Sequence, residues 1–331
     1  MKTGLLIAAA ALQLLVLAYM AGEREVVLHT GRTIYLRTAP IDPQDLFRGD
    51  YVTLSYEISR VSRDLARGTL PEIAKTKMDK WPKDLKVYTA LKQNPDGLAE
   101  VLYITDREPA EDLFIRGRLE SSWRPAFQVR YGIEAFFVEQ GKGLDLERGR
   151  RQGDIQIPLE MEVKLAGNGL AVLKGYRWSP LGIGLTLAFD KERRATGATI
   201  LLLNSSDQDL AIVDLPGGGS FTLDADTAWI EEEKSWHWVG AEAPRPTVSG
   251  YVRVLKPGES YPFKFDFSNP AWLVVKPGEK AKPISQLTEW QPRFRLVYRP
   301  PTAEETRGLP NAELIWHGEM PSRAFNGGRV D

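Results

Sequence analysis

Few side chains in this 331-residue chain have the types and spacing that enzyme chemistry uses. Cysteine is absent, which removes thiolate nucleophiles, disulfides and Cys-based zinc sites. The three histidines, His29, His237 and His317, lie far apart and show no metal-ligand spacing. A run of carboxylates at residues 231–233 lies among other charges, a pattern that is more typical of a solvated loop than of an acid–base pair. We therefore predict no catalytic residue, no metal site and no cofactor, and keep a hydrolase that uses a carboxylate pair as the alternative.

The densest pattern of the sequence covers residues 48–58. Gly49 can supply backbone angles that other residues avoid, and the residues after it alternate with the two-residue period of a strand. We predict a tight turn that leads into a central strand. The alternation predicts a core face with Val52, Leu54, Tyr56 and Ile58, and an opposite face with Tyr51, Thr53 and Ser55.

The polar side chains of this stretch are candidates for binding. They are Arg48, Asp50 and Tyr51, although Asp50 beside a turn glycine also has the structural role of accepting backbone N–H groups. A second strand pattern, over residues 130–143, places Glu134 between apolar neighbours. A half-buried carboxylate needs a partner, and Arg48 and Arg130 are the arginines expected to supply one. Glu134 is therefore the fourth candidate.

Three tryptophans lie around the run of charges at residues 231–233. Exposed Trp229, Trp236 and Trp238 would suit the flat faces of sugar rings, so a carbohydrate-binding protein is a further alternative. The competing interpretation is that these rings pack in a protein core. Because Trp236 and Trp238 are two residues apart, a strand would expose or bury both together.

The N-terminus has an apolar run at residues 4–20, interrupted only by Gln13. About 17 to 19 residues in a helix span about 26 to 28 Å, within the range of a membrane-spanning segment. Lys2 before the run predicts that the N-terminus stays in the cytoplasm and that the remainder is exported. Small residues are missing from the positions that cleavage of a signal peptide would need, where Tyr19 and Met20 stand instead. We predict an uncleaved anchor in the inner membrane, with the bulk of the protein in the periplasm or the extracellular space.

Composition predicts a mostly β, globular protein. Hydrophobic residues make up 43% and charged residues 26%, and the chain has 22 Pro and 29 Gly with little helical periodicity after the N-terminus. A net charge of −1 argues against nucleic acid as a partner. We predict a membrane segment at residues 1–22, a β-rich domain at residues 23–177 and a β-sandwich at residues 178–331.

In the first domain the pattern predicts a helix at residues 71–80 and strands joined by short turns. The expected strands are residues 26–29, 33–38, 85–91, 99–104, 154–159, 160–165 and 170–176. In the second domain they are residues 185–189, 198–204, 210–213, 220–223, 248–255, 261–267, 273–275, 294–298 and 314–317. With its short turns at residues 204–207 and 256–259, the second set resembles the immunoglobulin-like domains of exported bacterial proteins.

The stretch Gly49-Asp50-Tyr51-Val52-Thr53-Leu54-Ser55-Tyr56 resembles the defining motif of the GDYXXLXY family of bacterial membrane-anchored proteins. The Leu-Phe-Arg before it and the pattern at residues 131–141 are similar to that family too, so the resemblance covers roughly residues 1–176. It implies a membrane segment and an exported domain without an assigned activity, and it supplies no catalytic residue. We predict a binding or assembly role at the cell envelope, with an envelope protein as the partner.

Overall fold

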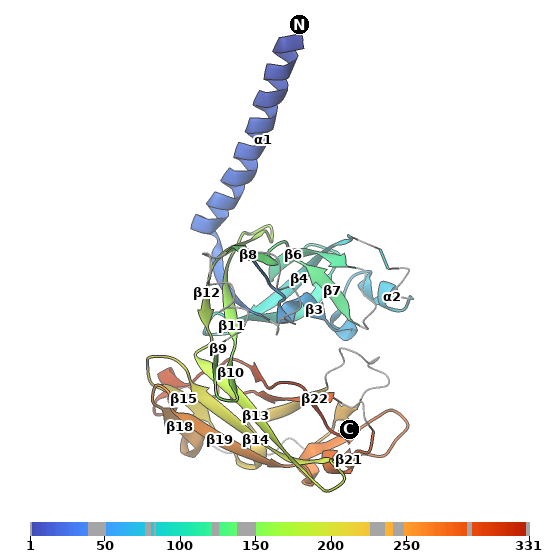
Figure 1. The fold of residues 1–331 in the computed structure, drawn as a ribbon, viewed down its shortest axis with the longest axis vertical. Coiled ribbons are helices and arrows are strands. Elements are labelled where there is room, and N and C mark those ends of the chain that lie inside the picture. Colours follow the sequence, from blue (N-terminus) through green and yellow to red (C-terminus); the bar gives the residue numbers. More distant parts are fainter. Residues whose placement is uncertain are drawn as a thin grey trace.

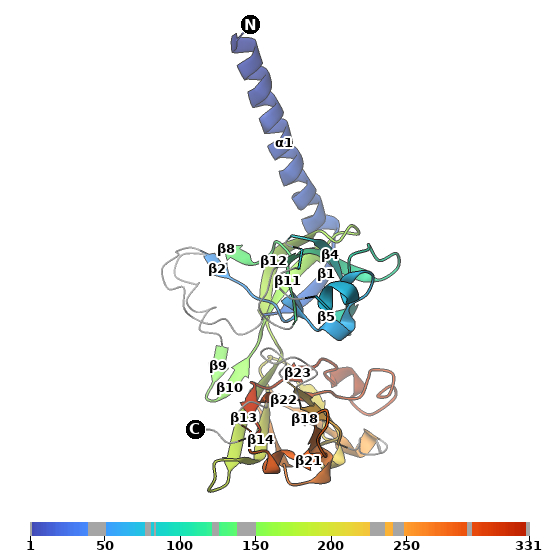
Figure 2. The same ribbon diagram turned by 90° about the vertical axis from the view of Figure 1, so that its right-hand side faces the viewer.

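The computed structural model describes residues 2–38, 51–76, 81–82, 84–120, 126–137, 150–225, 236–240, 248–289 and 293–328. A long helix, a first β domain and a second β domain follow one another along the long axis of the molecule (Figures 1 and 2). The fold is mostly β, as composition predicts.

The helix α1 (Lys2–Thr30) continues well past the apolar run. Residues 26–29 therefore lie in a helix, and the prediction of a strand there is wrong. Extending a helix that has already formed costs a β-branched residue only a few tenths of a kcal/mol, and the side chain of Val27 is buried. The helix ends at Thr30, and the N–H of the next residue, Gly31, donates to the Val27 carbonyl at 2.8 Å. A Cβ at position 31 would lie 2.5 Å from that carbonyl oxygen, so this exit requires glycine.

The first β domain combines two sheets and a ribbon around one core. Its strands are β1 (Arg32–Arg37), β2 (Tyr51–Thr53), β3 (Arg60–Val61), β4 (Lys86–Gln93), β5 (Ala99–Thr105), β6 (Leu113–Glu120), β7 (Phe127–Arg130), β8 (Ala135–Phe137), β11 (Leu159–Leu165) and β12 (Ala171–Trp178). The sheets have the orders β3-β7-β6-β4-β5 and β1-β11-β12, and β2 pairs with β8. A bridge between Tyr35 and Leu98 links the two sheets.

The predicted hairpin at residues 85–104 is confirmed by β4 and β5. Its turn closes through hydrogen bonds from the Gly97 N–H to the Asn94 carbonyl and from the Asn94 N–H to the Leu98 carbonyl. Gly97 has a φ of +87°, which glycine adopts without strain. The predicted helix at residues 71–80 is present as α2 (Leu70–Ala74), and its last four predicted residues lie outside the described part.

The GDYXXLXY stretch does not form a central strand. β2 is three residues long and, among the described strands, pairs only with β8. The chain then turns into the 3₁₀ helix η1 (Glu57–Ser59). Leu54, Tyr56 and Ile58 are buried, as the alternation predicts, and Ser55 is exposed. Every second side chain of this segment is therefore buried, as predicted, although most of the segment is not a strand. The short 3₁₀ helix η2 (Arg63–Leu65) follows β3.

The predicted strand over residues 130–143 is also divided. β7 ends at Arg130, Gly132 turns the chain with a φ of +80°, and β8 begins at Ala135. Tyr131 and Ile133 are buried, but Ala135 is exposed, so the predicted alternation ends at the turn. The strands β6 and β7 were missed by the sequence patterns.

The second β domain packs a five-stranded sheet against a four-stranded one. Its strands are β9 (Arg150–Gln152), β10 (Ile155–Ile157), β13 (Leu181–Phe189), β14 (Ala195–Asn204), β15 (Leu210–Val213), β16 (Phe221–Ala225), β17 (His237–Trp238), β18 (Val252–Leu255), β19 (Ser260–Asp266), β20 (Leu273–Val275), β21 (Lys282–Pro283), β22 (Arg293–Tyr298), β23 (Met320–Pro321) and β24 (Phe325–Asn326). The larger sheet has the order β19-β14-β13-β10-β9, and the facing sheet has the order β16-β22-β23, with β24 also paired to β22.

Aromatic side chains fill the space between these sheets. Phe221 of the smaller sheet contacts Phe263 and Phe265 of the larger one, with ring centroids 4.9 and 5.0 Å apart. Two small sheets, β15-β18 and β17-β20-β21, complete the domain. Short 3₁₀ helices lie in its connections: η4 (Pro216–Gly218), η6 (Val248–Tyr251), η7 (Pro270–Trp272), η8 (Ile284–Gln286) and η9 (Ala312–Leu314).

Most strands predicted for this domain are present, but the last is not. Residues 312–314 form η9, and Ile315 makes a single bridge to Ala211. The hairpin β9–β10 precedes the predicted boundary at residues 177/178, yet it extends the sheet of the second domain, because β10 pairs with β13. Among the described residues the chain therefore passes between the two domains at Pro158 and again at Ser179 and Pro180, and residues 138–149, outside the described part, join β8 of the first domain to β9 of the second.

Candidate functional site

Three charged residues stand side by side on neighbouring strands of the first domain. Glu160 of β11 is the register partner of Arg37 on β1 and of Arg177 on β12. The apolar residues of β11 point into the core, so the alternation of the strand directs Glu160 to the opposite face. In an isolated domain this face would meet water.

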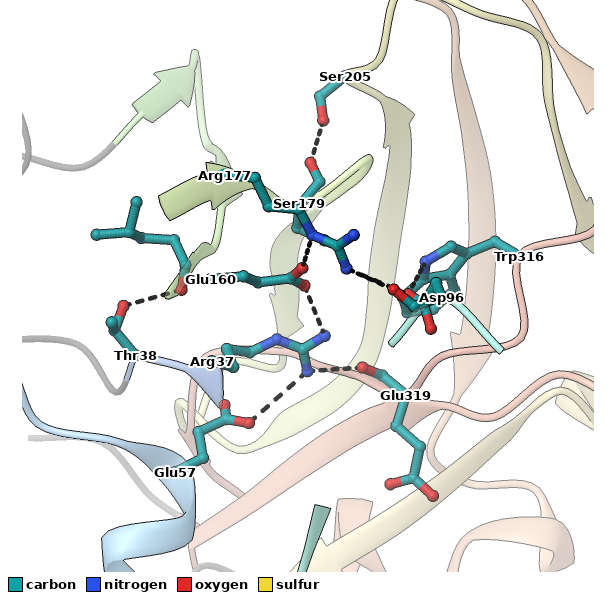
Figure 3. A network of polar contacts seen from close by, with 11 residues as sticks. Arg37, Thr38, Glu57, Asp96, Glu160, Arg177, Ser179, Ser205, Trp316 and Glu319 are labelled. Carbon is teal, nitrogen blue, oxygen red and sulfur yellow. Dashed lines mark hydrogen bonds and ion pairs between the residues drawn. The ribbon is translucent and has the colours of Figure 1, made fainter. Parts of the chain in front are cut away.

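The side chain of Glu160 is fully buried between the two arginines, as Figure 3 shows. Its Oε2 atom lies 2.8 Å from Nε of Arg177, and its Oε1 atom lies 3.6 Å from Nη2 of Arg37. Arg37, itself 5% exposed, also faces Glu57 of η1 at 3.7 Å. The guanidinium of Arg177 stacks on the ring of Tyr35 at 3.5 Å, which fixes its position further.

The second domain covers this face and donates to it. Nη1 of Arg37 donates to the backbone carbonyl of Glu319 at 2.6 Å, and Nε1 of Trp316 donates to Oδ2 of Asp96 at 3.0 Å (Figure 3). Asp96 lies in the β4–β5 turn, and its backbone carbonyl accepts a hydrogen bond from Arg177 at 2.9 Å. The face that carries Glu160 is thus part of the contact between the two domains.

The network extends into the second domain through Glu319. Its Oε1 atom lies 3.0 Å from Nε of Arg299, and Arg299 in turn pairs with Asp224 of β16 at 2.9 Å. At the chain crossing, Ser205 donates its hydroxyl to the Ser179 carbonyl at 2.6 Å. We call Arg37, Glu57, Asp96, Glu100, Glu160, Arg177, Trp316 and Glu319 the interdomain cluster.

Carboxyl groups of this cluster hold their protons more tightly than usual. Burial raises the pKa of Glu100 to about 7, and the negative charge of Glu319 adds to that effect. Burial also raises the pKa of Glu57, with Arg37 acting in the opposite direction. The pKa of Asp96 is raised by burial and by the charge of Glu160. The cluster therefore contains more carboxyl groups than its cations can neutralise well.

Several buried polar atoms at this contact have no hydrogen-bond partner among the described residues. They are Nε and Nη2 of Arg37, Oδ1 of Asp96, Oε1 of Glu100, Oε1 of Glu160 and Oγ of Ser179. Buried polar atoms of this kind are costly, and a buried ion pair fixes geometry more surely than it stabilises a fold. The arrangement is suited to holding two domains in one relative orientation. In the described part of the chain, no group of three or more His, Asp or Glu side chains is placed to hold a metal ion.

The candidates from the sequence lie elsewhere. Arg48 and Asp50 fall outside the described residues, and Tyr51 is described only in its backbone, which pairs with Phe137. The carboxylate of Glu134 accepts the backbone N–H groups of Tyr131 and Gly132 at 2.5 and 2.9 Å.

The arginine expected beside Glu134 has other partners. Arg130 faces Asp84 at 3.5 Å and Glu120 at 3.6 Å. Glu134 therefore closes the turn between β7 and β8 through backbone contacts.

The tryptophan candidates pack in the second domain. Trp236 is 3% exposed, and its Nε1 atom donates to Glu289 at 3.1 Å. Trp238 is partly buried, donates to the Ala271 carbonyl at 2.8 Å and stacks on Trp272. Both rings contact the same core: Trp236 is too deeply buried to offer a flat face to a sugar ring, and Trp272 covers one face of Trp238. Trp229 lies outside the described residues.

Fold and site together define a two-domain, mostly β protein whose halves meet across a buried charge cluster. The model of the GDYXXLXY protein family matches residues 13–175, which include most of α1, the first β domain and the hairpin β9–β10. Over these residues the chain belongs to the GDYXXLXY family. A search of curated proteins and a search of solved structures found no match.

Proposed function

We propose that the protein is anchored in a membrane by α1 and presents its two β domains on the exported side. The observation that carries this proposal is the exposure of apolar side chains along α1. Large apolar side chains that are at least half exposed are Ile7, Leu12, Leu14, Leu15, Val16, Leu17, Tyr19 and Met20. A surface of this kind, apolar all round, is typical of a helix surrounded by lipid.

The membrane-spanning part of this proposal rests on the sequence run and on that exposure. Within the part of the chain that the structure describes, no helix has a stretch both long and apolar enough to qualify as a membrane span. The apolar run begins at Gly4, and the described side chains of α1 begin at Ile7. An inner-membrane anchor, with the bulk in the periplasm or outside the cell, stays a prediction.

We infer that the second domain is immunoglobulin-like. In its larger sheet the consecutive strands β13 and β14 pair, and β19 adds to β14 from later in the chain. In the facing sheet β16 pairs with β22, which pairs with β23. Two facing antiparallel sheets, each built from strands that are not all consecutive in the chain, support this inference.

The role that this architecture supports best is binding or assembly at the cell envelope. α1 passes directly through Gly31 into β1, and the interdomain cluster joins the first domain to the second. The helix and the two domains are thereby held in fixed positions relative to one another along one axis. This arrangement suits a protein that presents a surface to an envelope protein. Of the carboxylates that the structure brings together, Glu57, Asp96, Glu160 and Glu319 are each paired with an arginine. No observation on the described residues favours the hydrolase or the carbohydrate alternative.

Charged substitutions in α1 test the anchor. Replacing Leu14 and Leu15 with Arg is expected to move the protein from the membrane fraction to the soluble fraction, because each Arg near the centre of a membrane helix costs about 2.5–3.5 kcal/mol. Fractionation of cells followed by blotting for a C-terminal tag measures this. Val26→Arg is the control, since Val26 is exposed but lies beyond the apolar run. Wild-type protein in the soluble fraction would contradict the anchor.

Co-purification tests the binding role. We expect the full chain, extracted in mild detergent after cross-linking in cells, to elute from a size-exclusion column with an envelope protein at a fixed ratio. A chain in which the Arg37 contact is removed by Arg37→Met should lose that partner if the domains must be docked to form the binding surface. Elution of the wild-type chain alone, at the size of a detergent-bound monomer, would argue against a stable partner.

A further inference from the structure

The apolar row that β13 contributes to the core of the second domain ends at an exposed aromatic residue. Because strand side chains alternate, every second residue of β13 belongs to this row. Leu181, Ile183 and Leu185 are buried and Leu187 is partly buried, but Phe189, the last residue of the strand, is 48% exposed. The hairpin of β13 and β14 reaches the end of the molecule opposite to α1 (Figures 1 and 2). Phe189 therefore lies on an outer tip of the protein.

The turn that follows Phe189 is held in one shape by its own contacts. The carboxylate of Asp190 accepts the backbone N–H of Arg194 at 2.8 Å and pairs with Nε of the same arginine at 2.7 Å. The Asp190 N–H donates to the Arg194 carbonyl at 3.0 Å, and the Arg193 N–H donates to the Asp190 carbonyl at 3.1 Å. Arg194 also pairs with Glu192 at 3.1 Å. A side chain presented on a preorganised turn loses little conformational entropy when it binds.

Arg193 has a backbone conformation that glycine adopts more easily. Its φ is +61°, in the left-handed region, where hairpin turns commonly have glycine and where the Cβ of other residues is strained. The Arg193 side chain is exposed and makes no hydrogen bond or ion pair among the described residues, so no described contact offsets this strain. The exposed side chain of Lys191 likewise makes no such contact within the described part of the chain. An arginine kept at a strained position indicates a role outside the fold.

We propose that Phe189, Lys191 and Arg193 form the surface through which the chain binds another protein, at an apolar pocket bordered by carboxylates. A rigid aromatic side chain that enters a pocket contributes much of the affinity of an interface. The two acidic residues of the turn are already paired with Arg194, so the charge left for a partner is that of the two free cations. One exposed ring buries too little apolar area to hold the chain on a lipid surface. This surface serves the binding role proposed above and depends on that role.

Photo-cross-linking in cells tests the contact directly. A benzophenone amino acid at position 189 of the full chain keeps an aromatic ring there and reacts with whatever touches it. We expect one protein product, whose cross-linked peptide, mapped by mass spectrometry, contains apolar residues together with Asp or Glu. The same probe at position 176 is the matched control, because Tyr176 is an aromatic residue of similar exposure, 42%, in the first domain. A product with lipid, with glycan or with a second copy of this chain, an equal yield of the same product from position 176, or no product at position 189 would overturn the proposal.

Two substitutions separate binding from folding. Phe189→Ala should reduce the amount of partner that co-purifies with the full chain at least roughly tenfold, whereas Tyr176→Ala should leave it unchanged. Arg193→Gly relieves the strained backbone, so the urea concentration at the midpoint of unfolding should stay the same or rise, while recovery of the partner falls about threefold to tenfold. A purely structural role for Arg193 predicts the opposite result, a lower midpoint with full recovery of the partner.

The results distinguish this surface from the binding role in general. An envelope protein that co-purifies with the wild-type chain and is fully retained by Phe189→Ala or by Arg193→Gly would leave the binding role standing and would rule out this surface. A wild-type chain that elutes without a partner would contradict both.

Discussion

Replacing Glu160 with Ala is expected to lower the free energy of unfolding by about 3–5 kcal/mol. The substitution leaves Arg37 and Arg177 facing each other without the carboxylate that separates them. Arg37 is 5% exposed and is held by the carbonyl of Glu319, so it has no route to water while the domains are docked. Urea unfolding of the full chain, followed by tryptophan fluorescence, measures the change.

Glu162→Ala is the matched control for this experiment. Glu162 is two residues further along β11 and pairs with Lys174 on β12 at 2.9 Å, but the side chain of Lys174 is half exposed. Water replaces the lost contact there, and we expect a much smaller change. Equal effects of the two substitutions would show that the buried ion pairs of Glu160 contribute no more to stability than the partly exposed pair of Glu162. A first unfolding transition that appears only in Glu160→Ala would indicate that the domains separate before either unfolds.

Tyr56→Ala is expected to destabilise the first domain by about 3–5 kcal/mol. Tyr56, the last residue of the GDYXXLXY stretch, is 1% exposed, and its hydroxyl donates to the Ile133 carbonyl at 2.6 Å. Tyr56→Phe removes only that hydrogen bond and leaves the buried carbonyl unpaired, so its cost should be about 1–3 kcal/mol. Thermal and urea unfolding of both variants separate the packing contribution from that of the hydrogen bond.

Ser55→Ala provides the reference for these two variants. Ser55 belongs to the same stretch but is exposed, and its substitution should change stability by less than about 0.5 kcal/mol. If Tyr56→Ala leaves stability intact, the Tyr56 ring does not hold the domain together. Loss of stability together with retained co-purification of a partner would indicate that this tyrosine of the motif serves the fold.

Sequence patterns predicted β4, β5, β11 and β12. Burial alternates along most of β11 because one face meets the core, whereas residues 87–91 of β4 are all buried. The same reasoning placed Leu54, Tyr56 and Ile58 in the core. It failed over residues 130–143, because a pattern of period two cannot show that Gly132 turns the chain between two short strands.

The interdomain cluster could not be predicted in this way. On β11 the apolar residues on either side of Glu160 face the core of the first domain, so the strand alternation predicts that Glu160 points away from that core, as it does. It is buried between Arg37 and Arg177, and the residues that contact this face from the second domain, Trp316 and Glu319, lie more than 150 positions further along the chain. The sequence shows only that Arg37, Glu160 and Arg177 are charged residues on three strands. That they stand side by side follows from the strand register, which is known only from the fold. Val26 and Val27 were misjudged for a similar reason, since their propensity for strands is outweighed by the helix that precedes them.

The hairpin β9–β10 has a consequence for how the chain reaches its folded state. During synthesis this hairpin emerges before β13, the strand that it pairs with, and the rest of the second sheet comes later still. Until then one edge of β10 offers unpaired backbone groups to any passing strand. A fragment that stops at residue 177 keeps that open edge permanently, while a fragment that starts at residue 178 exposes the matching edge of β13. The chain therefore has no position near its apparent boundary at which it can be divided into two self-contained pieces, and a soluble fragment that retains both domains should aggregate least.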